Sequence, residues 1–61
     1  MNTVAAAASI CMQLLINERL RLADLKARPD TDPKDVKISM LREKLYKYRY
    51  QNLQERLKNQ N

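Results

Sequence analysis

The chain turns at residues 27–35, which read ARPDTDPKD. Proline disfavours the α conformation in the residue before it, so Pro29 predicts that a first helix ends near Ala27. Asp32 and Pro33 form a helix-start signal, because the aspartate can cap free backbone N–H groups and proline fits the first helical position. The turn therefore separates two helical segments of similar length.

The composition on both sides of this turn favours helix. The chain has no glycine, only two prolines and many Ala, Leu, Lys, Arg, Gln and Glu residues, most of which are good helix formers. A short linker makes consecutive helices antiparallel neighbours. We expect an all-α, antiparallel two-helix hairpin in a single domain, 1–61, with helices over about 3–27 and 33–59 and a turn over about 28–32.

The apolar residues of both helices follow helical spacing. In the first helix they cover more than half of the circumference, which is more than one partner helix can bury. In the second helix the apolar stripe shifts around the axis between its two ends. The first helix places Val4, Ala7, Ala8, Cys11, Leu14, Leu15, Leu22 and Leu25 on one broad face, and the second begins with Ile38, Leu41, Leu45 and Tyr48 and continues with Tyr46, Tyr50, Leu53 and Leu57.

This excess of apolar surface predicts self-association. A domain of ~60 residues buries only about 60% of its unfolded surface and often needs further stabilisation. The single cysteine, Cys11, excludes an intrachain disulfide, and the absence of histidine removes usual zinc ligands. We therefore expect two hairpins to form a homodimeric four-helix bundle. The predicted oligomer interface comprises Ala8, Cys11, Leu15, Leu22, Leu45, Tyr50, Leu53 and Leu57.

The sequence predicts no catalytic, cofactor-binding or metal-ligating residues. Cys11 lies in the apolar arc with no histidine to activate it, and no glycine-rich loop can cradle a phosphate. Glu18 and Asp24 lie beside arginines at helical spacing, and Glu43 precedes Lys47 by four residues. We interpret these carboxylates as members of surface ion pairs, not as acids or bases in catalysis.

The basic character is concentrated in the second half of the chain. The net charge is +5, and residues 31–61 hold eight basic and four acidic side chains, against four and three in residues 1–30. Such a surface favours polyanions or acidic proteins as partners. Arginines spaced by seven residues lie on one side of the second helix. The candidate polyanion-binding residues are Arg42, Lys44, Lys47, Arg49 and Arg56.

Residues 45–50, which read LYKYRY, alternate every aromatic residue of the chain with cations. This composition is typical of single-stranded nucleic-acid binding, in which aromatic rings stack on bases. On a helix, however, Tyr46, Tyr48 and Tyr50 point in different directions. The competing interpretation is that the rings fill a helical core while their hydroxyl groups reach water.

The uncharged stretch 2–17 does not predict a membrane span, since a transmembrane helix needs ~20 mainly apolar residues. Binding of the first helix to a membrane surface is also disfavoured, because interfacial helices usually carry Lys or Arg beside the apolar face. The lone cysteine and the lack of a positively charged segment before the alanine run favour the cytoplasm.

Together these patterns predict a small, non-enzymatic helical interaction or adaptor protein. It would form homo-oligomers and present a basic surface to a macromolecular partner, which is an acidic protein or a nucleic acid. The alternative is a nucleic-acid-binding regulator that contacts RNA or DNA through the basic face of the second helix.

Overall fold

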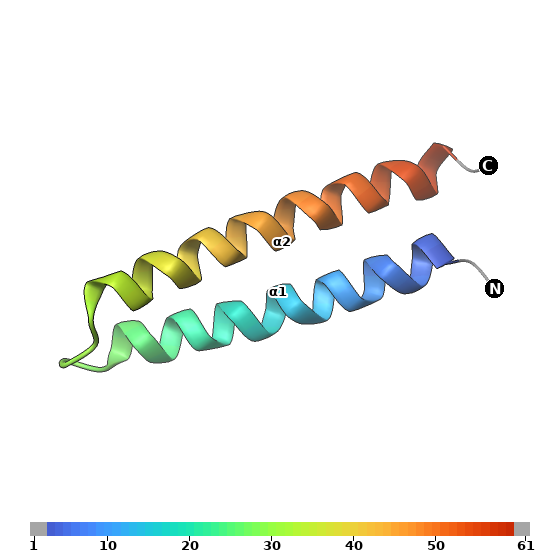
Figure 1. The fold of residues 1–61 in the computed structure, drawn as a ribbon. Coiled ribbons are helices and arrows are strands. Elements are labelled where there is room, and N and C mark those ends of the chain that lie inside the picture. Colours follow the sequence, from blue (N-terminus) through green and yellow to red (C-terminus); the bar gives the residue numbers. More distant parts are fainter. Residues whose placement is uncertain (1–2, 60–61) are drawn as a thin grey trace.

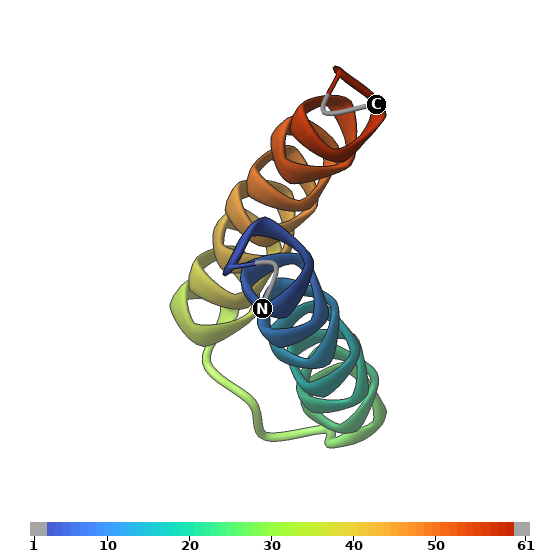
Figure 2. The same ribbon diagram turned by 90° about the vertical axis from the view of Figure 1, so that its right-hand side faces the viewer.

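The computed structural model describes residues 3–59, which form two helices and a short connection (Figure 1). α1 spans Thr3–Ala27 and α2 spans Pro33–Asn59. The helices run antiparallel and pack against each other in an elongated molecule about 49 Å long (Figures 1 and 2). The predicted all-α helical hairpin is therefore confirmed.

Residues that predicted the turn also form its hydrogen bonds. Asp32 Oδ1 accepts a hydrogen bond from the Lys34 backbone N–H at 2.9 Å, and the Asp32 carbonyl accepts one from the Asp35 N–H at 3.0 Å. Asp32 is thus the N-cap of α2. At the other side of the turn, the Arg28 N–H donates to the Leu25 carbonyl at 3.4 Å and closes the end of α1.

The helices meet along a single row of side chains on each helix, which we call the seam. Its residues recur at alternating steps of three and four, the 3.5-residue period that keeps one side of a helix towards its neighbour. All are buried or half-buried, and among the other residues of 3–59 only Ala7, Met12 and Thr31 are not exposed. The seam comprises Val4, Ala8, Cys11, Leu15, Glu18, Leu22 and Leu25 of α1, and Val36, Ser39, Glu43, Tyr46, Tyr50, Leu53 and Leu57 of α2.

The buried apolar core within this seam is small. Leu15, Ala8 and Leu22 retain 2%, 4% and 8% of their surface, and they are the buried apolar residues of the described chain. Complete burial of one leucine side chain contributes about 1.5–3 kcal/mol. Two leucines and one alanine are a small core for two helices of 25 and 27 residues.

The first half of α2 differs from the prediction. The apolar residues expected to face α1 there stay on the outside of the helix, and we call them the α2 outer stripe. The stripe consists of Ile38, Leu41, Leu45 and Tyr48, whose exposed fractions are 48%, 59%, 46% and 64%.

The reason is the constant period of the seam. When the row of Tyr46 and Tyr50 is continued backwards in steps of three and four, it reaches Ser39 and Val36. Ile38 is two residues from Val36, which is about 200° around a helix. A straight helix cannot present both rows to one partner, so polar residues enter the seam and the α2 outer stripe stays exposed.

Candidate interaction surfaces

A buried polar contact lies in the half of the seam nearer the turn. The Ser39 hydroxyl group donates a hydrogen bond to Glu18 Oε1 at 2.7 Å, and the two residues retain 2% and 7% of their surface. Next to it, Arg19 Nε donates to Glu43 Oε1 at 3.3 Å in an ion pair that joins the two helices. Within residues 3–59, no buried side-chain nitrogen or oxygen lacks a hydrogen bond. These contacts let polar residues occupy the seam without an unpaired group.

This contact corrects the interpretation of two carboxylates. Glu18 is not part of a surface ion pair, because it faces α2 and bonds to Ser39. Glu43 pairs with Arg19 of the other helix, where the sequence had placed Lys47 as its partner. The interpretation of Asp24 is confirmed, since it forms an exposed pair with Arg28 at 2.9 Å.

Two candidate nucleophiles, Cys11 and Ser39, also lie in the seam, whereas Ser9 is exposed on α1. Cys11 is half-buried, and Ser39 is covered and bonded to Glu18. Among the described residues, no cluster of three or more His, Cys, Asp or Glu side chains could hold a metal ion. The candidate sites that remain are the outer faces of the hairpin.

Most of the residues predicted for an oligomer interface lie between the two helices of a single hairpin. Leu45 is on the α2 outer stripe, whereas the other members of the set are in the seam between α1 and α2. Their side chains are therefore already covered, in whole or in part, by the second helix of the same hairpin. The residues placed in the seam are Ala8, Cys11, Leu15, Leu22, Tyr50, Leu53 and Leu57.

The first surface is the outside of α1, where no residue from Thr3 to Asn17 carries a charge. Two apolar pairs at helical spacing flank a polar pair in which Gln13 Nε2 donates to Asn17 Oδ1 at 3.2 Å. The exposed fractions are 62% and 41% for Ile10 and Leu14, and 42% and 66% for Ile16 and Leu20. We call these six residues the α1 outer face.

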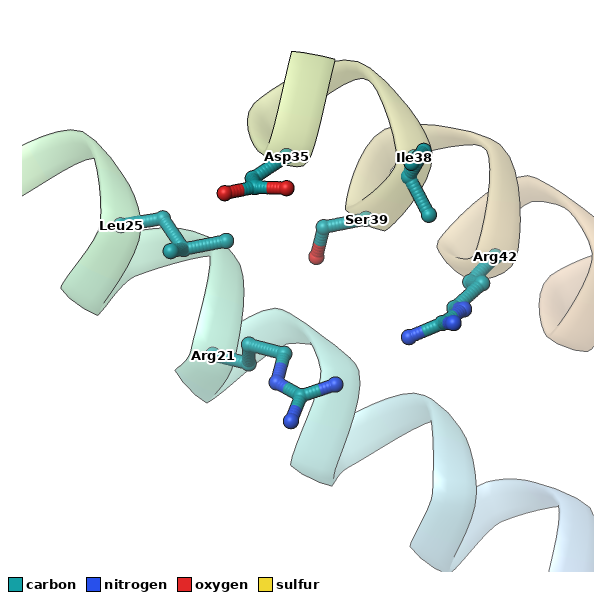
Figure 3. Close-up of a pocket in the computed structure, with 6 residues that line it drawn as sticks. All are labelled: Arg21, Leu25, Asp35, Ile38, Ser39 and Arg42. Carbon is teal, nitrogen blue, oxygen red and sulfur yellow. The ribbon is translucent and has the colours of Figure 1, made fainter. Parts of the chain in front are cut away.

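The second surface lies along one edge of the seam and carries arginines from both helices. Arg21 of α1 and Arg42 of α2 point into a shallow hollow of about 330 Å³, together with the Asp35 carboxylate and the Ser39 hydroxyl group (Figure 3). Arginine is well suited to phosphate because its planar group donates several hydrogen bonds in a fixed geometry. The carboxylate of Asp35 offsets part of the positive charge in this hollow.

The same edge continues towards the end of α2. Arg49 and Arg56 follow Arg42 at steps of seven residues and line a second hollow of about 250 Å³ beside Cys11. Within residues 3–59, none of these three arginines or Arg21 forms an ion pair. We call this edge the arginine side, defined by Arg21, Arg42, Arg49 and Arg56.

The third surface is a groove lined by lysines from both helices. Its volume is about 450 Å³, and Leu22, Met40 and Leu41 provide its apolar lining. Glu43 also lines the groove and is already paired with Arg19. We call it the lysine groove; its cations are Lys26 of α1 and Lys37, Lys44 and Lys47 of α2.

The predicted polyanion-binding residues are thus divided between two surfaces. Arg42, Arg49 and Arg56 belong to the arginine side, whereas Lys44 and Lys47 line the lysine groove. The sequence analysis missed the contribution of α1, because Arg21 and Lys26 join these surfaces only when the hairpin closes. Assigning the 3.5-residue period to both helices would have indicated them, since each lies beside a seam position.

The tyrosines do not form a single stacking surface. Tyr46 and Tyr50 are half-buried in the seam, and Gln54 Nε2 donates a hydrogen bond to Tyr50 Oη. Tyr48 lies on the α2 outer stripe and is 64% exposed. The prediction that all three rings point in different directions is therefore wrong for Tyr46 and Tyr50, which share the seam side of α2, and right for Tyr48. The three rings still do not form one exposed stacking surface.

No protein-family model, curated protein or solved structure shows a significant match to this chain. Neither helix in the described part of the chain is long and apolar enough to cross a membrane. Functional inference therefore depends on the three surfaces themselves.

Proposed function

We propose that this chain is a non-enzymatic helical interaction protein that self-associates through the α1 outer face and presents its basic surfaces to a macromolecular partner. The observation that carries the proposal is the distribution of apolar side chains. Nine large apolar residues of the described chain are exposed, whereas three apolar residues are buried. Exposed apolar surface on this scale is typical of interaction sites.

A second copy is the occupant that best suits the α1 outer face. The hairpin has a net charge of +5, so two copies repel each other unless they meet where charge is absent. The first part of α1 is such a place, because residues 3–17 are uncharged. Two hairpins joined through their α1 helices form a four-helix assembly, with both α2 helices on the outside.

The area required is compatible with the size of the molecule. A stable protein interface covers about 800 Å² on each partner, roughly one sixth of the hairpin's 5026 Å² of accessible surface. Self-association would also stabilise a hairpin whose buried core is small. The lone cysteine suits a reducing compartment, and we place the assembly in the cytoplasm.

Light scattering during size exclusion tests this proposal. Wild-type protein is expected to have twice the 7.2 kDa mass of one chain. The Ile10→Glu variant is expected to have the mass of one chain, because its carboxylate would lose hydration in the interface. The matched control is Leu41→Glu, the same type of change at a similarly exposed leucine of α2. A wild-type monomer at micromolar concentration, or dissociation caused equally by both variants, contradicts self-association through α1.

A second candidate function, nucleic-acid binding, is supported by the arginine side. Four arginines from two helices lie along one edge without ion pairs to described residues. Arg42 and Arg56 are 14 positions apart, which corresponds to about 21 Å along the helix. Over this length a DNA duplex presents several phosphates on each strand.

Titrations of labelled RNA and duplex DNA at several salt concentrations test the second candidate. Loss of one phosphate contact reduces the slope of log affinity against log salt by about 0.9 for duplex DNA. Arg49→Gln is expected to cause this change, and Lys58→Gln, outside the arginine side, is its control. Absence of binding at low salt rules out this function.

A further inference from the structure

The lysine groove combines an apolar lining with four cations. The hollows of the arginine side also contain apolar residues, such as Ile38 and Leu53, but each has two cations. The apolar lining of the lysine groove comes from Leu22, Met40 and Leu41, and Met40 and Leu41 are 50% and 59% exposed. Four lysines line the same groove. Glu43 is the acidic residue of the lining, and its contact with Arg19 leaves the lysine charges without compensation.

We propose that the lysine groove binds an acidic amphipathic helix of another protein. The apolar side of that helix would contact Met40 and Leu41, and carboxylates along its edges would pair with the lysines. This inference rests on the proposed function, since it names the macromolecular partner of the basic surface. Helix binding in an apolar groove is a common mode of recognition between proteins.

The dimensions of the groove suit a helical segment. The lysines of α2 extend from Lys37 to Lys47, which are ten positions apart, or about 15 Å and roughly three helical turns. Lys26 contributes a cation from the other helix, so that the partner meets positive charge from both sides of the hairpin. Met40 adds an adaptable side chain, because methionine fills irregular apolar spaces easily.

Charge argues against a second copy in this groove. Residues 34–49 contain six basic and two acidic side chains, and one of the two, Glu43, is already paired. A second α2 helix would bring the same cations against the lysines, and like charges across an interface cost several kcal/mol. The partner must therefore carry the opposite charge.

The apolar lining argues against a polyanion without apolar side chains. A phosphate backbone could pair with the lysines but would leave Met40 and Leu41 in contact with nothing apolar. The arginine side, where guanidinium groups line the hollows, is the better surface for phosphate. A peptide helix with one apolar side uses the lysines and the lining together.

A designed peptide tests the proposal in a fluorescence anisotropy titration with the 61-residue chain. The probe is about 15 residues long, enough for a marginally stable helix, with leucines on one side and glutamates at both edges. Lys44→Glu is expected to weaken its binding at least about tenfold. Lys58→Glu makes the same charge change outside the groove and is expected to retain wild-type affinity. Circular dichroism verifies that both variants fold, and Lys37→Glu provides a second groove variant.

Three outcomes would overturn the proposal. One is equal loss of affinity in Lys44→Glu and Lys58→Glu, which would show that net charge alone attracts the peptide. Another is equal binding of a peptide with the same composition but with its leucines spread around the helix. The third is loss of RNA or anionic-vesicle binding in Lys44→Glu with no effect on the peptide, which would assign the groove to a nucleic acid or a membrane surface.

The same titration distinguishes this proposal from self-association. Ile10→Glu lies outside the groove and is expected to bind the peptide with wild-type affinity, whether or not the protein is a dimer. Peptide binding without a dimer contradicts only the α1 interface. A dimer that does not bind the peptide contradicts only the lysine groove.

Discussion

The outer surfaces of α1 and α2 expose similar amounts of apolar side chain in different electrostatic settings. Ile10 and Leu20 on α1 are 62% and 66% exposed, close to the 59% and 64% of Leu41 and Tyr48 on α2. Residues 3–17, which include Ile10 but not Leu20, carry no charge, whereas residues 34–49 carry six basic and two acidic side chains. Apolar exposure alone indicates that both faces are candidate interaction sites. The charge around it indicates which face can meet a copy of itself and which needs an acidic partner.

The largest expected effect comes from breaking the seam that supports both faces. Ala8 is 4% exposed, and Ala8→Arg would force a long charged side chain between the helices. An uncompensated buried charge typically costs about 3–5 kcal/mol, and overpacking adds about 1–3 kcal/mol. We expect Ala8→Arg to be largely unfolded in a thermal melt followed by circular dichroism. Gln51→Arg, at an exposed position of α2, should change stability by no more than about 0.5 kcal/mol.

The next effect concerns the polar contact inside the seam. Glu18→Ala leaves the buried Ser39 hydroxyl group without its partner and should cost about 1–3 kcal/mol in a urea titration. Adding Ser39→Ala to that variant removes the unpaired group and should recover part of the loss. If the two substitutions are simply additive, the hydrogen bond does not couple the helices as described.

A smaller effect separates self-association from hairpin stability. Gln13 is exposed on the α1 outer face, so Gln13→Arg should change the stability of the hairpin by no more than about 0.5 kcal/mol. The same substitution places a charge where two copies meet and should weaken self-association at least about tenfold, as measured by sedimentation equilibrium. Unchanged self-association would show that two copies do not meet at the α1 outer face.

The smallest effect is expected at the turn, which belongs to neither face. The Asp24–Arg28 pair spans 2.9 Å, but its side chains are 60% and 63% exposed. Exposed pairs four residues apart contribute about 0.3–0.5 kcal/mol, so Asp24→Asn should lower stability by no more than this in a thermal melt. A loss above 1 kcal/mol, on the order of an N-cap deletion, would show that this pair holds the turn.

The hairpin could be predicted from sequence because its signals are local. Pro29 and Asp32-Pro33 fix the turn through backbone geometry that depends on neighbouring residues alone. The seam of α1 was also largely predictable, since Ala8, Leu15 and Leu22 are apolar.

The seam of the first half of α2 could not be predicted from hydrophobicity. Ser39 and Glu43 are polar and become acceptable there only because Glu18 and Arg19 of the other helix meet them. Such pairing depends on the register between the helices, which no local pattern specifies. The apolar residues Ile38 and Leu45 were therefore assigned to the wrong side of the helix.

The candidate surfaces could also be predicted only in part. The seven-residue spacing placed Arg42, Arg49 and Arg56 on one side of α2, but nothing in the sequence assigned Lys44 and Lys47 to a groove of their own. Arg21 and Lys26 could have been added only by assigning the 3.5-residue period to both helices, because α1 contributes to each surface only in the closed hairpin.

The central claim, that α1 and α2 use separate faces for different occupants, is tested most directly by assaying Ile10→Glu and Leu41→Glu for both activities. Each sample is measured for mass by light scattering and for binding of the acidic peptide by anisotropy. The account predicts that Ile10→Glu loses self-association and keeps peptide binding, whereas Leu41→Glu keeps self-association and loses peptide binding. If either variant loses both activities while remaining helical, a single surface serves both and the account is contradicted.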